Sequence, residues 1–451
     1  MAHQLFGYII NALENKLVSV ENDKESYGDY FNSWHPNDSS GKTRVFSRNT
    51  RLTLRVMFWL IVSRIVQSLP VALDSFFSAL NLPVPLKSAF SMKRTVIKSS
   101  FFQLMGQTLT EKFYKSNFVR KWRDYVLVSC DGSRVALPEV EELGEKFGWY
   151  HTYQGEELYP SAKACVFQDT LNNITLYAAL EPKDKDERYS FEEHFEDALA
   201  ITGQRAIMLL DRGYFSYLTI YLMIKSGIKF VMKARRLPWA EAFIRSGRKQ
   251  DTIRIHPSRA TSIYGNRGWR QEQVKELTVR LVRFDHPDGS ADVLVTNLIP
   301  AEGITCADII GLYRLRWPVE TSYGIYKNEE ALELFSSFRP DGVLQDFHAA
   351  VILFNLASIL AMDCDIKNKK KIKPDMNVII GLIHNLCPVL ALGPANREFG
   401  RRLRTIADEA SHYKILIIPD RSFPRVRRKR KTSGKFFRHT NFSLAVLRRL
   451  I

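Results

Sequence analysis

Two apolar runs of strand length, residues 125–130 and 204–210, each lead directly into an aspartate. The first run reads YVLVSC and precedes Asp131 and Gly132, and the second ends in AIMLL and precedes Asp211. Short apolar runs of this kind are typical of buried strands. A carboxylate just past the end of a buried strand is exposed where ligands bind in sheet proteins. The pair therefore predicts an α/β fold with two acidic side chains at a sheet edge.

The segments around these aspartates predict the rest of the sheet. Apolar runs bounded by turn residues predict strands, and apolar residues at four-residue spacing predict helices. Strands are expected at residues 162–167, 174–180 and 228–232, and helices at 188–200 and 215–225. Strand, hairpin, helix, strand, helix, strand is the order of an RNase H-like sheet.

The stretch YRLRWPVETSYGIYK combines a carboxylate with two cations and a phenol. On a helix, Tyr313, Arg316, Glu320 and Lys327 would fall within roughly 60° of the circumference. Pro318 disfavours one continuous helix, and a helix that starts there keeps Glu320 and Lys327 on one face. The arrangement suits a site that holds a metal ion and a phosphate. The alternative is a surface amphipathic helix whose charges face water.

These four residues have the spacing Y-x2-R-x3-E-x6-K, which resembles the signature of the IS-four family of bacterial DDE transposases. The blocks that begin at Asp131 and Asp211 resemble the surroundings of that family's first and second catalytic aspartates. The segment FSMKR, which contains Lys93 and Arg94, resembles an early block of the same family. The resemblance covers approximately residues 45 to 385.

The resemblance implies an RNase H-like, retroviral-integrase-like catalytic core at residues 119–385, with a mainly β insertion at about 235–300. A helical N-terminal DNA-binding region is expected at residues 1–118, and a helical and basic C-terminal region at 386–451. In the N-terminal region, a short helix, a turn and a basic helix are consistent with a helix-turn-helix reader. The alternative is a helical cap on the catalytic domain.

The same resemblance implies that Asp131, Asp211 and Glu320 form a catalytic triad. Three carboxylates gathered in one place repel one another, and divalent cations relieve that repulsion. Hard oxygen ligands suit Mg²⁺, with Mn²⁺ as a substitute. Two such ions activate an attacking water or DNA 3′-hydroxyl and stabilise the leaving oxygen. The expected cofactor is therefore a pair of Mg²⁺ ions.

The function implied by the resemblance is cut-and-paste transposition of an insertion sequence. The expected partners are double-stranded DNA, as terminal inverted repeats and as target, and a second copy of the chain. Residues expected to contact DNA are Tyr313, Arg316, Lys327, Lys93 and Arg94. Two alternatives stay open: a catalytically inactive, transposase-derived DNA-binding protein, and an RNase H-like nuclease that acts on other substrates.

The charge of the chain supports a polyanionic partner. The formal net charge is +17, and the tail at residues 421–438 carries nine Lys or Arg residues. An excess of this size on a globular chain indicates nucleic acid, although the tail can also be a plain solvated segment.

The cysteines and the apolar runs bear on the compartment. The five cysteines lack metal-finger spacing, which favours reduced thiols in a cytosolic compartment. The resemblance to bacterial transposases implies the bacterial cytoplasm, at the nucleoid. The longest early apolar run, Val56–Val62, is too short to span a bilayer, so no membrane segment is expected. The first residues lack the basic start of a signal peptide, so no export is expected.

Two tryptophans fall inside the expected β insertion, where short strands are predicted at residues 252–255, 277–284 and 292–297. Trp239 and Trp269 can stack on an unpaired base at the transposon end. The favoured alternative is that each is a tryptophan of the core or of a sheet face.

Overall fold

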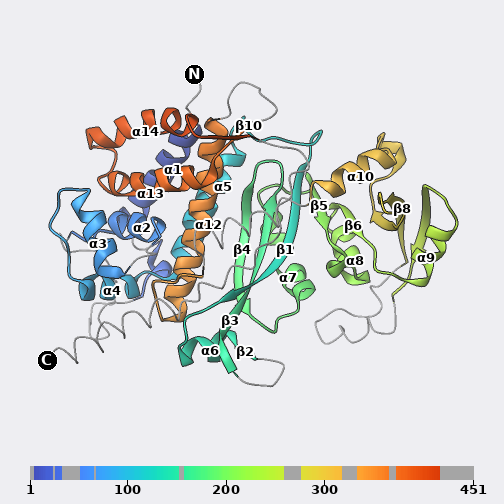
Figure 1. Cartoon of the computed structure of the whole chain (residues 1–451), viewed down its shortest axis with the longest axis horizontal. Coiled ribbons are helices and arrows are strands. Elements are labelled where there is room, and N and C mark those ends of the chain that lie inside the picture. Colours follow the sequence, from blue (N-terminus) through green and yellow to red (C-terminus); the bar gives the residue numbers. More distant parts are fainter. Residues whose placement is uncertain are drawn as a thin grey trace.

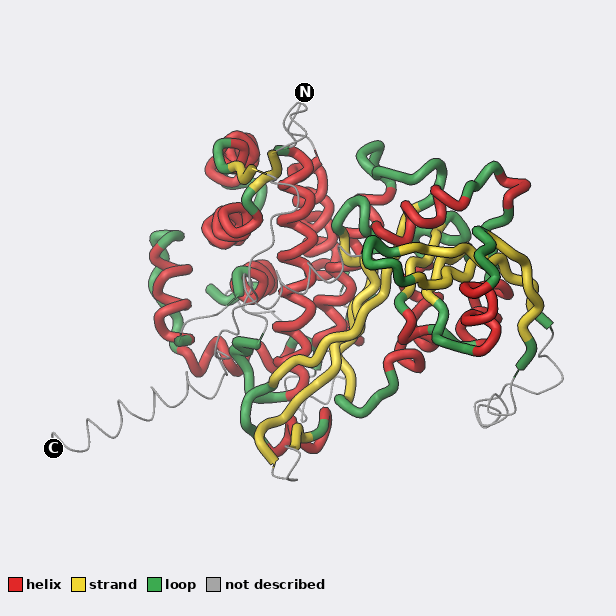
Figure 2. The backbone as a smooth tube through the Cα atoms, turned by 45° about the vertical axis from the view of Figure 1, so that its right-hand side comes forward, coloured by secondary structure: helices red, strands yellow, loops and turns green. Residues whose placement is uncertain are grey.

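The computed structural model of the chain describes residues 5–23, 26–32, 51–64, 68–151, 157–257, 276–316, 333–364 and 372–416. Helices gather on one side of the molecule, and a long twisted sheet extends from them to the other side (Figure 1). Turned by 45°, the long strands lie directly beside the helical part (Figure 2). The mixed α/β class expected from the sequence is confirmed.

Five strands make the part of the sheet that contains both aspartates. They lie in the order β4-β3-β1-β5-β6, where β1 pairs antiparallel with β3, and β3 with β4. The strands β5 and β6 continue from β1 in parallel. Their bounds are β1 (Val126–Ala136), β3 (Glu157–Asp169), β4 (Ile174–Pro182), β5 (Ala206–Leu210) and β6 (Lys229–Lys233). All five predicted strands are present.

The first strand does not end at Cys130, as the apolar run suggested. β1 continues to Ala136, and Asp131 lies inside it, opposite Val166 of β3. The pairing of β1 with β5 runs only from Val126 to Ser129. The strand therefore outlasts its apolar run because β3 continues to pair with it after β5 has ended.

The predicted insertion extends the same sheet. Its last strand runs antiparallel beside β6, and Asn297 bonds the backbone of Ile228 and Phe230 at 2.9 Å each. The elements are α9 (Pro238–Arg245), β7 (Gln250–Ile255), β8 (Leu277–Asp285) and β9 (Ala291–Thr296). The predicted strands are confirmed, and the helix α9 is an addition that the sequence analysis did not include.

Helices cover both faces of the sheet. α7 (Glu187–Leu199) and α8 (Tyr217–Lys225) pack on one face. α10 (Cys306–Arg314) packs on the other face, over β5, β6 and β8. The predicted helices at 188–200 and 215–225 are thus confirmed, although a 3-10 turn at Arg212–Tyr214 precedes α8.

The helical part is built around α12 (Pro340–Asp363), which lies between the other helices and β4. This helix has the length and apolarity of a membrane span, but 94% of its apolar window is buried inside the protein. Its neighbours are α1 (Leu5–Asn22), α2 (Leu54–Val62), α5 (Ser99–Tyr114), α13 (Met376–Ala391) and α14 (Arg397–Ser411).

The N-terminal region is helical, as predicted. Pro70 lies in the first turn of α3 (Leu69–Ser78), after α2 has ended at Val62. Proline is compatible with a first turn because the N–H that it lacks would have no intrahelical partner there. α4 (Lys87–Val96) follows α3. The smaller elements are α6 (Glu141–Phe147), β2 (Trp149–His151), β10 (Ile372–Pro374) and β11 (Lys414–Leu416).

Candidate active site

The alternation of side chains along β1 decides which way Asp131 points. Val126, Val128 and Cys130 belong to the apolar cluster on the α7 side of the sheet. Leu127 belongs to the cluster on the α10 side. Because successive strand residues face opposite sides, Asp131 shares the α10 side with Leu127.

Asp211 reaches the same side by the same rule. On β5, Met208 and Leu210 face α7, whereas Ile207 and Leu209 face α10. In the parallel register Ser129 lies beside Leu209. Asp131 comes two residues after Ser129, and Asp211 comes two residues after Leu209. Neighbouring strands lie about 5 Å apart. Two half-buried aspartates from segments 80 residues apart in the chain therefore share one level and one face of the sheet.

Tyr313 approaches this edge from α10. Its hydroxyl donates a hydrogen bond to Asp211 Oδ1 at 3.3 Å. Burial of the phenol, followed by the negative charge of Asp211, raises the pKa of Tyr313 well above its usual value. The phenol therefore keeps its proton, remains a donor and holds the Asp211 carboxylate in one orientation.

Arg316 follows α10 and turns back towards Tyr313. Its guanidinium carbon lies 5.9 Å from the centre of the Tyr313 ring, and the residue is 7% exposed. Its backbone N–H donates to the Tyr313 carbonyl at 3.1 Å. The phenol, the guanidinium and the Asp211 carboxylate thus form one connected group.

The other predicted residues of this stretch, Glu320 and Lys327, lie outside the described residues, as do Trp269 and the basic tail at 421–438. Trp239 is half-buried and its ring centre lies 6.1 Å from that of Phe215. This packing agrees with the core alternative for Trp239.

The donor atoms at the edge suit a hard divalent cation. Asp131 and Asp211 present carboxylate oxygens on one face at the ends of parallel pairing. Mg²⁺ and Mn²⁺ prefer such ligands, and Mg²⁺ is commonly bound by one or two carboxylates together with substrate phosphates. The residues present therefore fit the metal that the sequence analysis expected.

A second acidic group within the described residues has a different character. Glu181, Glu193 and His194 place ligand atoms within 4.8 Å of one another. However, the Lys185 ammonium pairs with both glutamates, at 2.6 Å from Glu193. Burial opposes ionisation of Glu181, but hydrogen bonds from His194, Lys185 and Ser190 outweigh it and lower its pKa to about 2. A lysine already supplies the positive charge here, so this group is a structural ion-pair network.

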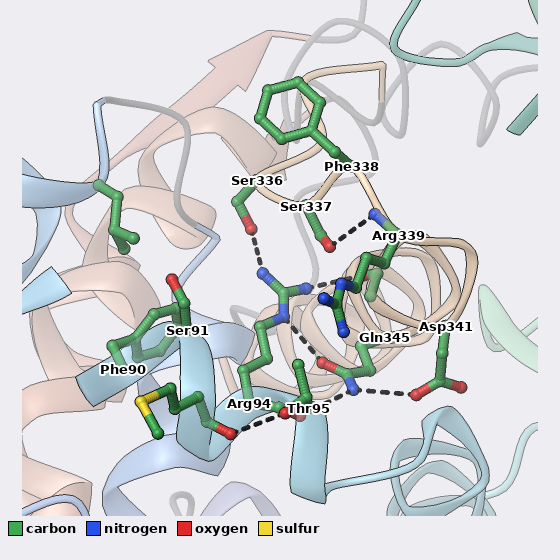
Figure 3. Close-up of a pocket in the computed structure, with 13 residues that line it drawn as sticks. Phe90, Ser91, Arg94, Thr95, Ser336, Ser337, Phe338, Arg339, Asp341 and Gln345 are labelled. Atoms are coloured by element: carbon green, nitrogen blue, oxygen red, sulfur yellow. Dashed lines mark hydrogen bonds between the residues drawn. The ribbon is translucent and has the colours of Figure 1, made fainter. Parts of the chain in front are cut away.

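Arg94 does not contact solvent as a DNA-binding residue would. It is 5% exposed, and its guanidinium makes four hydrogen bonds with groups that precede or belong to α12. Figure 3 shows its bonds to Ser336 and Gln345. One of these is an ion pair with Asp346 at 2.8 Å. The expectation that Arg94 binds DNA is therefore corrected: a buried cation needs its counter-charge, and this one ties α4 to α12. Lys93 is half-buried beside it.

One further carboxylate at the aspartate edge was missed by the sequence analysis. The Tyr214 hydroxyl donates to Glu187 Oε1 at 2.7 Å, and the same oxygen lies close to Gly132. Glu187 stands 56 residues after Asp131 in the chain, within a charged run that carries no distinguishing pattern. The sequence feature that could have pointed to Glu187 is the glycine that stands shortly after each aspartate, Gly132 and Gly213.

Comparison with known proteins bears on the identity of the chain. A solved piggyBac transposase synaptic complex with hairpin DNA is similar at a TM-score of 0.41 and 10% identity, covering 95% of this chain and 84% of that one. A comparison with curated protein sequences gives no match. The model of the transposase DDE domain matches residues 122–356, more than half of the 451-residue chain. The matched stretch includes β1, β5 and α10. By this match, the chain belongs to the family of transposases with a DDE domain.

Proposed function

We propose that this transposase cuts and joins DNA at the edge of the sheet where Asp131 and Asp211 meet, with Glu320 as the third carboxylate. The observation that carries the proposal is the shared level and shared face of the two aspartates on the adjacent strands β1 and β5. Tyr313 and Arg316, from the signature stretch, lie at the same edge.

The catalytic core is proposed to be RNase H-like. The strand order β4-β3-β1-β5-β6, antiparallel on one side of β1 and parallel on the other, supports this assignment. The first two carboxylates would then come from the first and fourth strands of the core in chain order. The strands β7 to β9 lengthen the sheet on the far side of β6.

Asp131 and Asp211 would hold divalent cations, proposed to be Mg²⁺, with Glu320 completing the ligand set. Such ions lower the pKa of an attacking water or hydroxyl and stabilise the charge on the leaving oxygen. The Tyr313 hydroxyl fixes the orientation of the Asp211 carboxylate by donating to Oδ1. Arg316 is proposed to bind a DNA phosphate, because a guanidinium matches phosphate geometry with two parallel bonds. Since Arg316 is 7% exposed, this contact requires its side chain to turn outward when DNA binds.

The proposed substrate is duplex DNA that carries the terminal inverted repeats of the element, followed by target DNA. The net charge of +17 supports strong phosphate contacts along the chain. A homodimer is proposed because each of the two transposon ends needs an active site. We place the activity in the bacterial cytoplasm, where the DNA is. The alternative of an inactive DNA-binding derivative is not favoured, because both aspartates and Tyr313 are in place.

The test is cleavage of duplexes with the element's own terminal repeats in Mg²⁺. Wild-type protein should nick the repeats, whereas Asp131→Asn, Asp211→Asn and Glu320→Gln should bind them without nicking. Normal thermal melts for the variants would show that folding is retained. Nicking at the wild-type rate by any one variant would remove that residue from the proposed site. A gel shift of the wild-type complex without any nicking would instead favour the inactive derivative.

A further inference from the structure

The Glu187 carboxylate is wedged between the two segments that carry the catalytic aspartates. A methyl group on Gly132 would place its carbon 2.7 Å from Glu187 Oε1 and 3.1 Å from Glu187 Cδ. Cβ atoms essentially never approach another atom this closely, so a side chain at position 132 would force the end of the Glu187 side chain to move. A methyl group on Gly213 would lie 4.0 Å from the other oxygen, Oε2.

Tyr214, in the turn that follows Asp211, forms a hydrogen bond with the same carboxylate. It donates its hydroxyl proton to Glu187 Oε1 at 2.7 Å and is 1% exposed. Its ring packs edge-on against Phe191 of α7, with 5.5 Å between ring centres. Burial raises the pKa of Tyr214 well above its usual value, so the phenol stays a donor. The turn that follows Asp211 is thus bonded to the residue that touches the backbone next to Asp131.

The start of α7 fixes where Glu187 stands. Asp186 caps the helix and accepts hydrogen bonds from the N–H groups of Arg188 and Tyr189, at 2.9 and 3.3 Å. Glu187 is therefore the first residue of the helix, where a negative side chain is favoured by the helix dipole. Gly132 lies next to Asp131 on the strand and so faces the α7 side, opposite to the aspartate. Glu187 therefore lies on the α7 face of the sheet, opposite to the face on which Asp131 lies.

We infer that Glu187 is a positioning residue that sets the separation and orientation of Asp131 and Asp211 through Gly132 and Tyr214. This role rests on the proposed function of the two aspartates as metal ligands. It also supplies a physical reason for the glycine after Asp131, since any larger residue there would displace the carboxylate. Groups that orient metal ligands typically change metal affinity 10–100-fold when they are removed.

The experiment measures Mn²⁺ binding to the full-length protein by the electron paramagnetic resonance signal of free Mn²⁺, with thermal melts in parallel. Glu187→Ala, Tyr214→Phe and Gly132→Ala should each weaken Mn²⁺ binding, Glu187→Ala by about ten-fold or more. Glu187→Gln should weaken it less, because the amide oxygen can still accept the Tyr214 hydroxyl. Glu193→Gln, on the same helix but in the Lys185 network, is the matched control and should bind like wild type.

A double variant separates positioning from general damage. Gly132→Ala should weaken Mn²⁺ binding in the wild-type background but add little to Glu187→Ala, because the new methyl group then occupies vacated space. Additive effects of the two changes, or wild-type Mn²⁺ affinity in Glu187→Ala, would overturn the inference.

The proposed function of the two aspartates as metal ligands is tested by other variants. Asp131→Ala and Asp211→Ala should abolish Mn²⁺ binding at this edge. If they do so while Glu187→Ala binds normally, the positioning role alone fails. If they bind Mn²⁺ like wild type, the metal site itself is wrong and the positioning role falls with it.

Discussion

Replacing Arg94 by alanine is the sharpest test of how the N-terminal helices are joined to the rest of the molecule. The change removes four guanidinium hydrogen bonds, to Gln345, Ser336, Gly342 and Asp346. It leaves the Asp346 carboxylate, in a residue that is 1% exposed, bonded by Ser336 but without its ion-pair partner. A buried charge that loses its partner is strongly unfavourable.

The magnitude follows from that burial. Breaking a buried ion pair by removing one partner costs about 3–5 kcal/mol. Arg94→Lys should recover only part of this loss, because one ammonium cannot reproduce the planar fork that reaches four groups. Arg94 and Arg339 line one cavity of about 460 Å³, but Arg339 is exposed, so Arg339→Ala is the matched control. Its change should remain within about 0.5 kcal/mol.

The assay is urea unfolding followed by circular dichroism, together with DNA binding at a temperature where each variant is folded. We expect the Arg94→Ala protein to unfold at lower urea, yet to bind DNA with near wild-type affinity while folded. A loss of DNA affinity with an unchanged unfolding midpoint would refute the reasoning, because it would make Arg94 a DNA contact after all.

Three further predictions concern Tyr313, Asp169 and the basic tail. Tyr313→Phe removes the bond to Asp211 and should lower the nicking rate several-fold without changing the melting temperature; a single-turnover assay on nicked product checks this, and an unchanged rate would separate Tyr313 from the site. Burial raises the pKa of Asp169 to about 6, so the folded state holds that proton more tightly than the unfolded state does. The free energy of unfolding should therefore fall by up to about 3 kcal/mol as pH rises from about 4 to 6, and Asp169→Asn should lose that dependence in urea titrations at the two pH values. Deleting residues 421–451 should flatten the slope of log affinity against log salt, which is about −0.9 for each phosphate neutralised; an identical slope would make the tail a solvated appendage.

Much of the local structure around the two aspartates could be predicted from the sequence. Apolar runs of strand length predicted β1 and β5, and the confirmed helices followed from apolar residues at four-residue spacing. These features are local, because the period of a run reflects which faces of its own element are buried. The end of β1 was not predictable in this way, since its continuation to Ala136 depends on the neighbouring strand β3.

Charge was the least reliable guide to position. Arg94 stands in a basic segment whose composition indicated DNA contact, yet its side chain is buried against α12. Its partner Asp346 lies 252 residues away. No local pattern reports such a pairing, because the energy of a buried ion pair depends on two segments that meet through the fold.

The sequence alone indicated an α/β sheet, two aspartates that directly follow apolar runs of strand length, a phenol and a cation at fixed spacing, and a net charge that suits a nucleic-acid partner. Only the tertiary structure decided that β1 and β5 are neighbours, in a register that brings Asp131 and Asp211 to the same height along the sheet. It also decided that Tyr313 reaches Asp211 and that Glu187 fills the space beside Gly132. The physical reason is that residue types and spacing set the preferences of each segment, whereas strand order, register and burial depend on how distant segments pack together.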